Sequence, residues 1–259
     1  MGQRAKLKID VTEEFERLPK APIIEAVIEI RAPAEAPWEE GDIQERLKPQ
    51  LPDYPKVVST GAFRQQLKVE PGSVEQSYRD LGWKGLWFQS ADDRHIAQFN
   101  RESFVFSRLH PYESWEQFSN EALRLWRMHI QLANPTQVQR LGLRFINRMP
   151  LVKGKQLKFY LASPPKTPRK LKLTLNGFFH QDKLSVPGHP YAANITRTVL
   201  PPEEPGTQDA ALILDIDVLS EEPFELRNGA LESRLAEMRW LKNRAFFGSI
   251  THKALESFR

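Results

Sequence analysis

The sequence contains no cysteine. This absence excludes disulfide bonds, thiolate zinc sites and cysteine nucleophiles together, and it is typical of proteins from a reducing compartment. Long apolar runs are missing too, since no stretch approaches the ~20 apolar residues that a membrane-spanning helix requires. Residues 1–18 also lack the apolar core of a signal peptide. We therefore expect a cytoplasmic protein that does not enter a membrane.

Strong catalytic signatures are also absent. The sequence has no GxSxG, GxxxxGK(S/T) or GxGxxG motif, which argues against a serine hydrolase, a P-loop enzyme and a dinucleotide-binding fold. The six histidines lie at positions 95, 110, 129, 180, 189 and 252, and no two have the helical spacing of a zinc site. His180, Asp182 and His189 are near enough in sequence to form an acid–base cluster, although histidines near strand ends are usually exposed to solvent.

Proline-rich stretches divide the chain into segments whose hydrophobic periodicity predicts strands and helices. The first half, about residues 20–134, predicts strands at 23–31, 61–69, 83–89, 95–100 and 103–109, a short helix at 41–48, and a long helix from about 112. The second half, about residues 135–258, predicts strands at 138–149, 170–179, 192–200 and 210–219, a short helix at 155–161, and a long helix from about 224. We expect one domain over residues 1–259 with an α+β fold. Its mostly antiparallel, curved sheet would be built from two similar halves, by internal duplication, each ending in a long helix.

The first predicted strand of each half carries charges with the same spacing. Glu25 and Glu29 fall on the face opposite to the apolar residues of their strand, because side chains alternate with a period of two. Arg144 and Arg148 share the corresponding face of the other strand with Arg140. We predict that the two strands are neighbours, with Arg144 and Arg148 opposite Glu25 and Glu29, so that the charges pair and fix the register.

Basic residues are concentrated in one part of the chain. Between Gln137 and Val199, twelve Lys and Arg face a single acid, Asp182, so this stretch carries +11 and the remainder −7 of the net +4. Such a concentration indicates a site for an anionic ligand, although acidic parts of the same chain can equally neutralise it. The candidate anion-binding residues are Arg140, Arg144, Arg148, Lys170 and Lys172.

A metal-dependent enzyme is the alternative. Asp215 and Asp217 share a face of their predicted strand, and with Glu25 and Glu29 they would supply hard oxygen ligands for Mg²⁺ or Mn²⁺. Carboxylates beside basic residues are how metal-dependent phosphohydrolases hold a polyphosphate. The ExxxE spacing of Glu25 and Glu29 differs, however, from the ExExK motif of triphosphate-tunnel enzymes.

Four sequence blocks together resemble a sporadically distributed family of prokaryotic proteins of about this length: APIIEAVIEIR, FVFSRLHPYESWEQF, RLGLRFINRMPL and RAFFGSIT. The blocks span nearly the whole chain. The resemblance implies a single-domain protein spread by lateral transfer, as accessory and defence-linked genes often are. It assigns no catalytic residue.

From these observations we expect a non-enzymatic binding or regulatory protein that needs no cofactor. Its basic face would take an acidic partner, either nucleic acid or an acidic protein surface. The alternative is a metal-dependent phosphohydrolase or nuclease acting on a polyphosphate or a nucleic acid. A third possibility is a partner-dependent regulator encoded beside its target. The sequence identifies neither the ligand nor the oligomeric state.

Overall fold

The computed structural model describes residues 5–35, 39–70, 73–168, 170, 172–201 and 210–259, with the backbone alone at residues 42, 62–70 and 73–81. The chain divides into two compact units. The larger unit contains residues 1–28, 109–112 and 139–259, and the smaller unit contains residues 29–108 and 113–138. No helix in the described part of the chain is long and apolar enough to cross a membrane.

The strands follow the hydrogen-bonded order β2-β3-β4-β5-β1-β7-β10-β9-β8, and β1 contributes residues to both units. Every pairing with a defined register is antiparallel. The larger unit contains most of β1 (Ile23–Arg31) together with β7 (Arg140–Pro150), β8 (Phe179–Ser185), β9 (Tyr191–Leu200), β10 (Ala211–Ser220) and β11 (Phe224–Glu225). The smaller unit contains β2 (Lys56–Glu70), β3 (Ser73–Gln89), β4 (His95–Asn100), β6 (Gln137–Val138) and all of β5 (Ser103–Leu109) except its last residue.

The two long helices belong to different units. The smaller unit contains α1 (Glu40–Leu47), η1 (Lys48–Gln50) and α2 (Trp115–Ala133), and the larger unit contains α3 (Leu157–Tyr160), α4 (Ala230–Ser249), α5 (His252–Leu255) and η3 (Glu256–Phe258). The Ser114 hydroxyl begins α2 by accepting a hydrogen bond from the Gln117 N–H at 3.2 Å. Asn134 ends this helix in the left-handed conformation.

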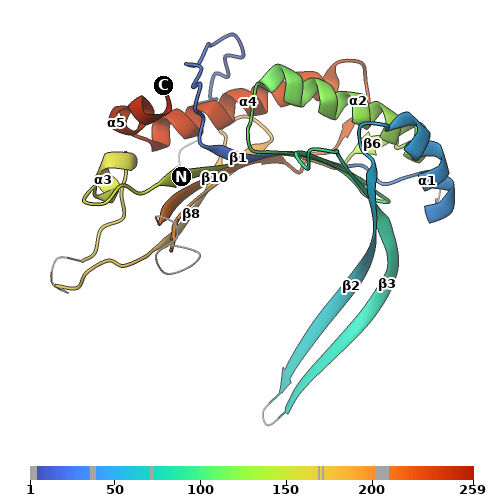
Figure 1. The fold of residues 1–259 in the computed structure, drawn as a ribbon, viewed down its shortest axis with the longest axis horizontal. Helices are drawn as coiled ribbons and strands as arrows, with labels where there is room; N and C mark the ends of the chain where they lie inside the picture. The colour runs from blue at the N-terminus through green and yellow to red at the C-terminus, as the bar shows by residue number, and fades with distance from the viewer. Residues whose placement is uncertain (1–4, 36–38, 71–72, 169, 171, 202–209) are drawn as a thin grey trace. The chain divides into compact units, whose positions relative to one another are not determined.

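Helix α4 covers one face of the strands of the larger unit (Figure 1). Alternate residues of β7 point towards this face, so Leu141, Leu143 and Phe145 are completely buried. The helix contributes Leu235 and Met238 from an apolar stripe with helical spacing. Most of the charged residues of β7 and β10 are left on the opposite face, whereas Asn147 is buried and donates to the Leu214 carbonyl oxygen at 2.9 Å.

The core of the smaller unit is aromatic. The Phe99 ring of β4 packs edge-on against Phe88 of β3 and Phe104 of β5, with ring centroids 5.7 Å and 5.4 Å apart. His129 of α2 is completely buried beside these rings and stacks on Trp126 at 5.2 Å. Burial lowers the pKa of His129 to about 3, so its imidazole is neutral near pH 7.

Strands β2 and β3 form a ribbon that extends beyond their neighbours (Figure 1). Their pairing covers residues 56–70 and 73–89, whereas β4 pairs with β3 only from Gly85 to Gln89. Glycine is required at position 85, because a Cβ there would lie 2.3 Å from the Phe99 carbonyl oxygen. Among the described strands, residues 73–84 of β3 therefore pair with β2 alone.

The predicted α+β class with a largely antiparallel sheet is confirmed, but several predicted boundaries are wrong. Strands β2 and β3 begin at Lys56 and Ser73 rather than at residues 61 and 83. Residues 172–178 are irregular, so β8 begins only at Phe179 rather than at residue 170. The backbone at Lys172 has a φ of 50°, which an extended strand does not accommodate. The second long helix begins at Ala230 rather than near residue 224, after Gly229 in a left-handed conformation.

The predicted repetition of two similar halves stays a prediction. Both halves contain the expected series of a strand, a short helix, further strands and a long helix. The predicted division at residues 134 and 135 lies close to the boundary between the units at 138 and 139. Strand β1 differs from the prediction, because its residues up to Ile28 belong to the larger unit together with the second half.

Candidate functional site

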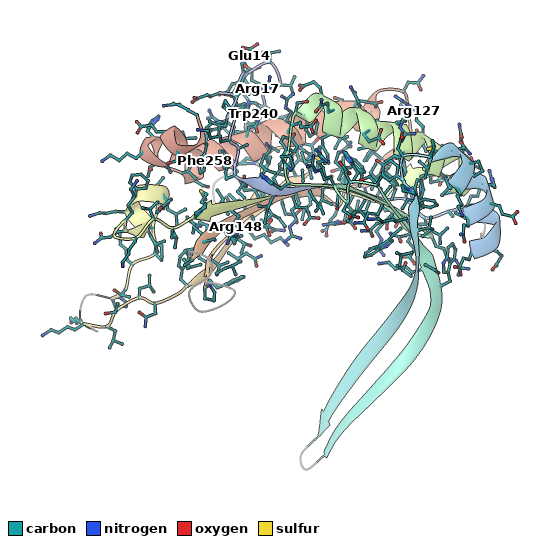
Figure 2. The ribbon with its side chains drawn as sticks, in the orientation of Figure 1. Glu14, Arg17, Arg127, Arg148, Trp240 and Phe258 are labelled. Atoms are coloured by element: carbon teal, nitrogen blue, oxygen red, sulfur yellow. The ribbon has the colours of Figure 1, made fainter. Side chains whose placement is uncertain are left out.

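The face of the larger unit opposite α4 carries a row of charged side chains. On β7, Arg140 and Arg148 are half-buried and Arg144 is exposed. Figure 2 shows Arg148 on the side of the strands away from α4. On β10, Asp215 and Asp217 are half-buried on the same face, and the register places Asp217 opposite Arg144. The period of two that buries the apolar residues therefore also places three arginines and two aspartates on one face.

Arg144 forms a bidentate ion pair with Asp215. Its Nε donates to Oδ1 at 2.9 Å and its Nη2 donates to Oδ2 at 2.6 Å. The Asp215 side chain is only 14% exposed, whereas the Arg144 side chain is 48% exposed. The hydrogen bonds to Asp215 raise the pKa of Arg144. Paired N–H donors on one carboxylate are the strong form of this interaction, so Arg144 is held as a fixed, largely neutralised cation.

Asp217 is a half-buried carboxyl group with a raised pKa. Burial raises its pKa, and the neighbouring charge of Asp215 acts in the same direction. A hydrogen bond from Asn194 Nδ2 at 3.4 Å and the positive charges of Arg140 and Arg144 oppose this change. Since the net pKa is raised, the attraction to the arginines does not fully offset the cost of burying the carboxylate.

The predicted adjacency of the two first strands is confirmed, because β1 and β7 are neighbours. Glu25 lies near enough to Arg144 to contribute to its raised pKa. The two hydrogen bonds of Arg144, however, go to Asp215 rather than to Glu25. Pairing of Arg148 with Glu29 stays a prediction.

The carboxylates of the metal hypothesis do not all belong to one unit. Glu25, Asp215 and Asp217 are in the larger unit, whereas Glu29 is in the part of β1 that belongs to the smaller unit. Within the residues that the structure describes, no three or more His, Asp or Glu side chains are arranged to hold a metal ion. Asp215 is moreover committed to Arg144 by both of its carboxylate oxygens.

The other candidate anion-binding residues, Lys170 and Lys172, are both exposed. They belong to residues 153–183, which we call the basic segment. It contains eight Lys or Arg residues and one acid, Asp182. Its lysines are all exposed and lie at positions 153, 155, 158, 166, 170, 172 and 183.

The one acid of the basic segment is already neutralised. Asp182 accepts a hydrogen bond from Arg197 Nη2 and contacts His180 Nε2 at 3.0 Å. In the described part of the chain, none of the lysines of the basic segment is paired with a carboxylate. Lys155 alone among them contacts a ring, with its Nζ 3.7 Å from the Phe159 centroid.

The suggested cluster of His180, Asp182 and His189 is only partly formed. His180 and Asp182 are in contact on β8. The Nε2 atom of His189 instead lies 2.7 Å from the carbonyl oxygen of Leu7. The three side chains therefore do not form one acid–base group.

Two features of the larger unit were not foreseen from the sequence. Large apolar side chains are exposed within and directly after the basic segment: Leu173 (68%), Leu175 (40%), Phe179 (72%) and Leu184 (49%). These leucines fall within the strand that the sequence predicts at residues 170–179, in the alternating run KLKLTL. The second feature is Lys242 of α4, whose Nζ lies 4.0 Å from the centroid of the Phe145 ring. Burial, with help from the charge of Arg239, lowers the pKa of Lys242 to about 7.

The sequence matches no family model and no curated protein. The function is therefore inferred from the residues and their geometry.

Proposed function

We propose that this chain is a non-enzymatic binding protein whose basic segment takes an acidic ligand. The observation that carries the proposal is the exposure of all seven lysines between residues 153 and 183, while Asp182, the only acid there, is bound to Arg197. Like charges close together in the chain repel one another, and a ligand with several negative charges relieves that repulsion. The larger unit thus offers cations that its own carboxylates leave available.

The geometry favours these lysines over the arginines of β7 as the main anion contacts. The guanidinium of Arg144 already donates two hydrogen bonds to Asp215. A ligand would have to displace a carboxylate to use that guanidinium, whereas Lys170, Lys172 and Lys183 offer exposed ammonium groups. Arg140 and Arg148, which are half-buried on the face opposite α4, are secondary candidates for contacts with the anion.

The proposal involves no metal cofactor. A metal-dependent phosphohydrolase would need Asp215 as a ligand, and Arg144 occupies both oxygens of that carboxylate. Ligand-linked stabilisation tests this point, because a site filled at a hundredfold excess over the dissociation constant adds about 2.7 kcal/mol to the free energy of unfolding. We expect no rise in melting temperature with Mg²⁺ or Mn²⁺ beyond that caused by equal ionic strength.

The setting of the protein is part of the same proposal. A cytoplasmic location fits a sequence with no cysteine. An accessory, regulatory or defence-linked role follows from the resemblance of its four sequence blocks to a sporadically distributed prokaryotic family. An origin by duplication would explain the similar series of elements in the two halves.

Binding of two polyanions tests the function. Fluorescence anisotropy would measure the affinity of the full chain for labelled poly-L-glutamate and for a single-stranded oligothymidylate of about 20 nucleotides. We expect binding of at least one at low salt, with an affinity that falls as salt rises. For the oligothymidylate, the log–log slope should be about −0.7 per neutralised phosphate. Absence of binding to both at low salt, or binding indifferent to salt, would overturn the proposal.

A further inference from the structure

Strand β8 lies at the end of the strand order and pairs with β9 alone among the described strands. The Val186 N–H donates to the Tyr191 carbonyl oxygen at 2.9 Å, at the position where the β8–β9 register continues. In an antiparallel ladder, residues alternate between bonding to the partner and pointing away from it. Hence the main-chain N–H and C=O groups of four β8 residues point away from β9: Phe179, Gln181, Lys183 and Ser185.

Among the described residues, this edge lacks most of the devices that protect exposed strands. Proteins usually block an edge with proline, lysine, a bulge or a covering segment, and β8 contains one lysine, Lys183. The seven residues of β8 contain no proline, and all are exposed except the half-buried Asp182. Phe179 and Leu184 expose 72% and 49% of their surface. An uncovered edge with apolar side chains is a template for a further strand.

The residues that precede β8 in the sequence also expose apolar side chains. Leu173 and Leu175 are 68% and 40% exposed, and they alternate with polar residues in the run KLKLTL. Lys170, Lys172 and Lys183 add positive charge on the two sides of this stretch. A partner that buries the apolar residues must therefore also carry acidic groups. A second copy of this chain would bring lysine against lysine, so its charge does not fit.

We propose that β8 and residues 172–178 bind an extended acidic polypeptide, which adds to the edge of β8 as a further strand. This inference rests on the proposed function and names the partner of the same basic segment. The N–H and C=O groups that point away from β9 occur at every second residue of β8. An added strand presents its own hydrogen-bonding groups with the same two-residue repeat. The exposed leucines favour a polypeptide with alternating apolar and acidic residues over nucleic acid, whose sequence-tolerant contacts come from stacking and phosphate charge.

A peptide and its N-methylated form test strand addition on the unmodified protein. The probe is a peptide of alternating glutamate and valine, about eight residues long, the length of a typical strand. Its control has the same sequence with N-methyl groups on alternate residues, which remove the N–H donors along one edge. We expect the unmodified peptide to bind at least tenfold more tightly, since two or more main-chain hydrogen bonds are lost in the control.

A variant of β8 tests the same edge from the side of the protein. Gln181→Pro removes an outward N–H, which does not pair with β9, and proline is tolerated at strand edges. Gln181→Ala is the matched control, because it also loses the contact of Gln181 Nε2 with Thr196 Oγ1 but keeps the N–H. We expect the proline variant to bind the peptide at least fivefold more weakly than the alanine variant. Equal circular dichroism spectra would establish that both variants fold.

The possible results separate this inference from the proposed function. Equal binding of both peptides, or equal binding by the two Gln181 variants, overturns strand addition and leaves the acidic-ligand function standing. Binding of the oligothymidylate without binding of the peptide overturns the polypeptide partner and identifies nucleic acid as the ligand. If the peptide, the oligothymidylate and poly-L-glutamate all fail to bind, the inference and the proposed function are both overturned.

Discussion

Arg144 of β7 and Asp215 of β10 are joined by two parallel hydrogen bonds, although 71 positions separate them in the sequence. The pair neutralises one of the three arginines on the face of the larger unit opposite α4. The structure thus accounts for Arg144 on a half-buried strand: it balances a largely buried aspartate on the neighbouring strand. The lysines of the basic segment have no such counterpart among the described residues.

The Arg144–Asp215 pair should contribute measurably to folding. Asp215→Asn removes the charge that Arg144 contacts, so we expect the free energy of unfolding to fall by about 1 kcal/mol. Urea denaturation at pH 7 measures the change. Adding Arg144→Gln to Asp215→Asn should cost less than the sum of the two single changes, because the residues act as a unit. Strict additivity of the two losses would contradict the pairing.

Asp217→Asn should have the opposite effect on stability. Burial raises the pKa of Asp217 in the folded state. The ionised carboxylate is therefore less stable in the folded state than in the unfolded state. Its contribution to stability therefore falls as pH rises through the range between the two pKa values. We expect Asp217→Asn to be more stable than the unmodified protein at pH 7 and to lose this advantage in acid. A lower stability at pH 7 would contradict the electrostatic account.

His129 should make the protein acid-sensitive. Its pKa is about 3 in the folded state and about 6.5 when unfolded. Between these pKa values the imidazole is protonated in the unfolded state but not in the folded state. The free energy of unfolding therefore falls by about 1.4 kcal/mol per pH unit below pH 6.5. Between pH 7 and 5.5, His129→Phe should lose about 1 kcal/mol less than the unmodified protein. His252→Gln, at an exposed position, is the control and should keep the full loss.

Lys242 should make the free energy of unfolding depend on pH in the alkaline range. Its pKa is about 7 in the folded state and about 10.4 when unfolded. Between these values the unfolded state binds more protons, so stability should rise with pH, by about 2 kcal/mol from pH 7.5 to 9. Lys242→Met should abolish that rise, because it removes the titrating amine beside Phe145. Lys253→Met, an exposed lysine of α5, should leave it unchanged.

Local sequence rules predict much of the fold. A period of two correctly assigned the two faces of β1 and β7, because a strand with one buried face must alternate. Asn134 followed by proline is a typical helix-stop signal, and α2 ends directly before it. The neighbouring positions of β1 and β7 were inferred from opposite charges with equal spacing, and the strand order agrees.

Long-range partners could not be predicted in the same way. The choice of Asp215 over Glu25 as the partner of Arg144 depends on β10 lying beside β7, which no local pattern encodes. The run KLKLTL shows the converse failure. It has the alternation of a strand, but Lys172 takes a positive φ and no described strand pairs with residues 172–178. Tertiary contacts, or a partner, decide whether such a segment becomes a strand.

The most direct test of the acidic-ligand function compares two sets of lysine substitutions. One variant carries Lys170→Gln, Lys172→Gln and Lys183→Gln, and a second removes three exposed lysines elsewhere in the larger unit, at positions 8, 20 and 253. Both lose the same net charge, so only the position of the charge differs. The measurement is the affinity for poly-L-glutamate and oligothymidylate as a function of salt.

We expect the first variant to bind at least tenfold more weakly at low salt, with a log–log slope for the oligothymidylate that is smaller by about 0.7 for each lysine that contacted a phosphate. The second variant should keep most of the affinity and the slope. Equal losses in the two variants would contradict the account, because they would show that net charge, and not the basic segment, attracts the ligand.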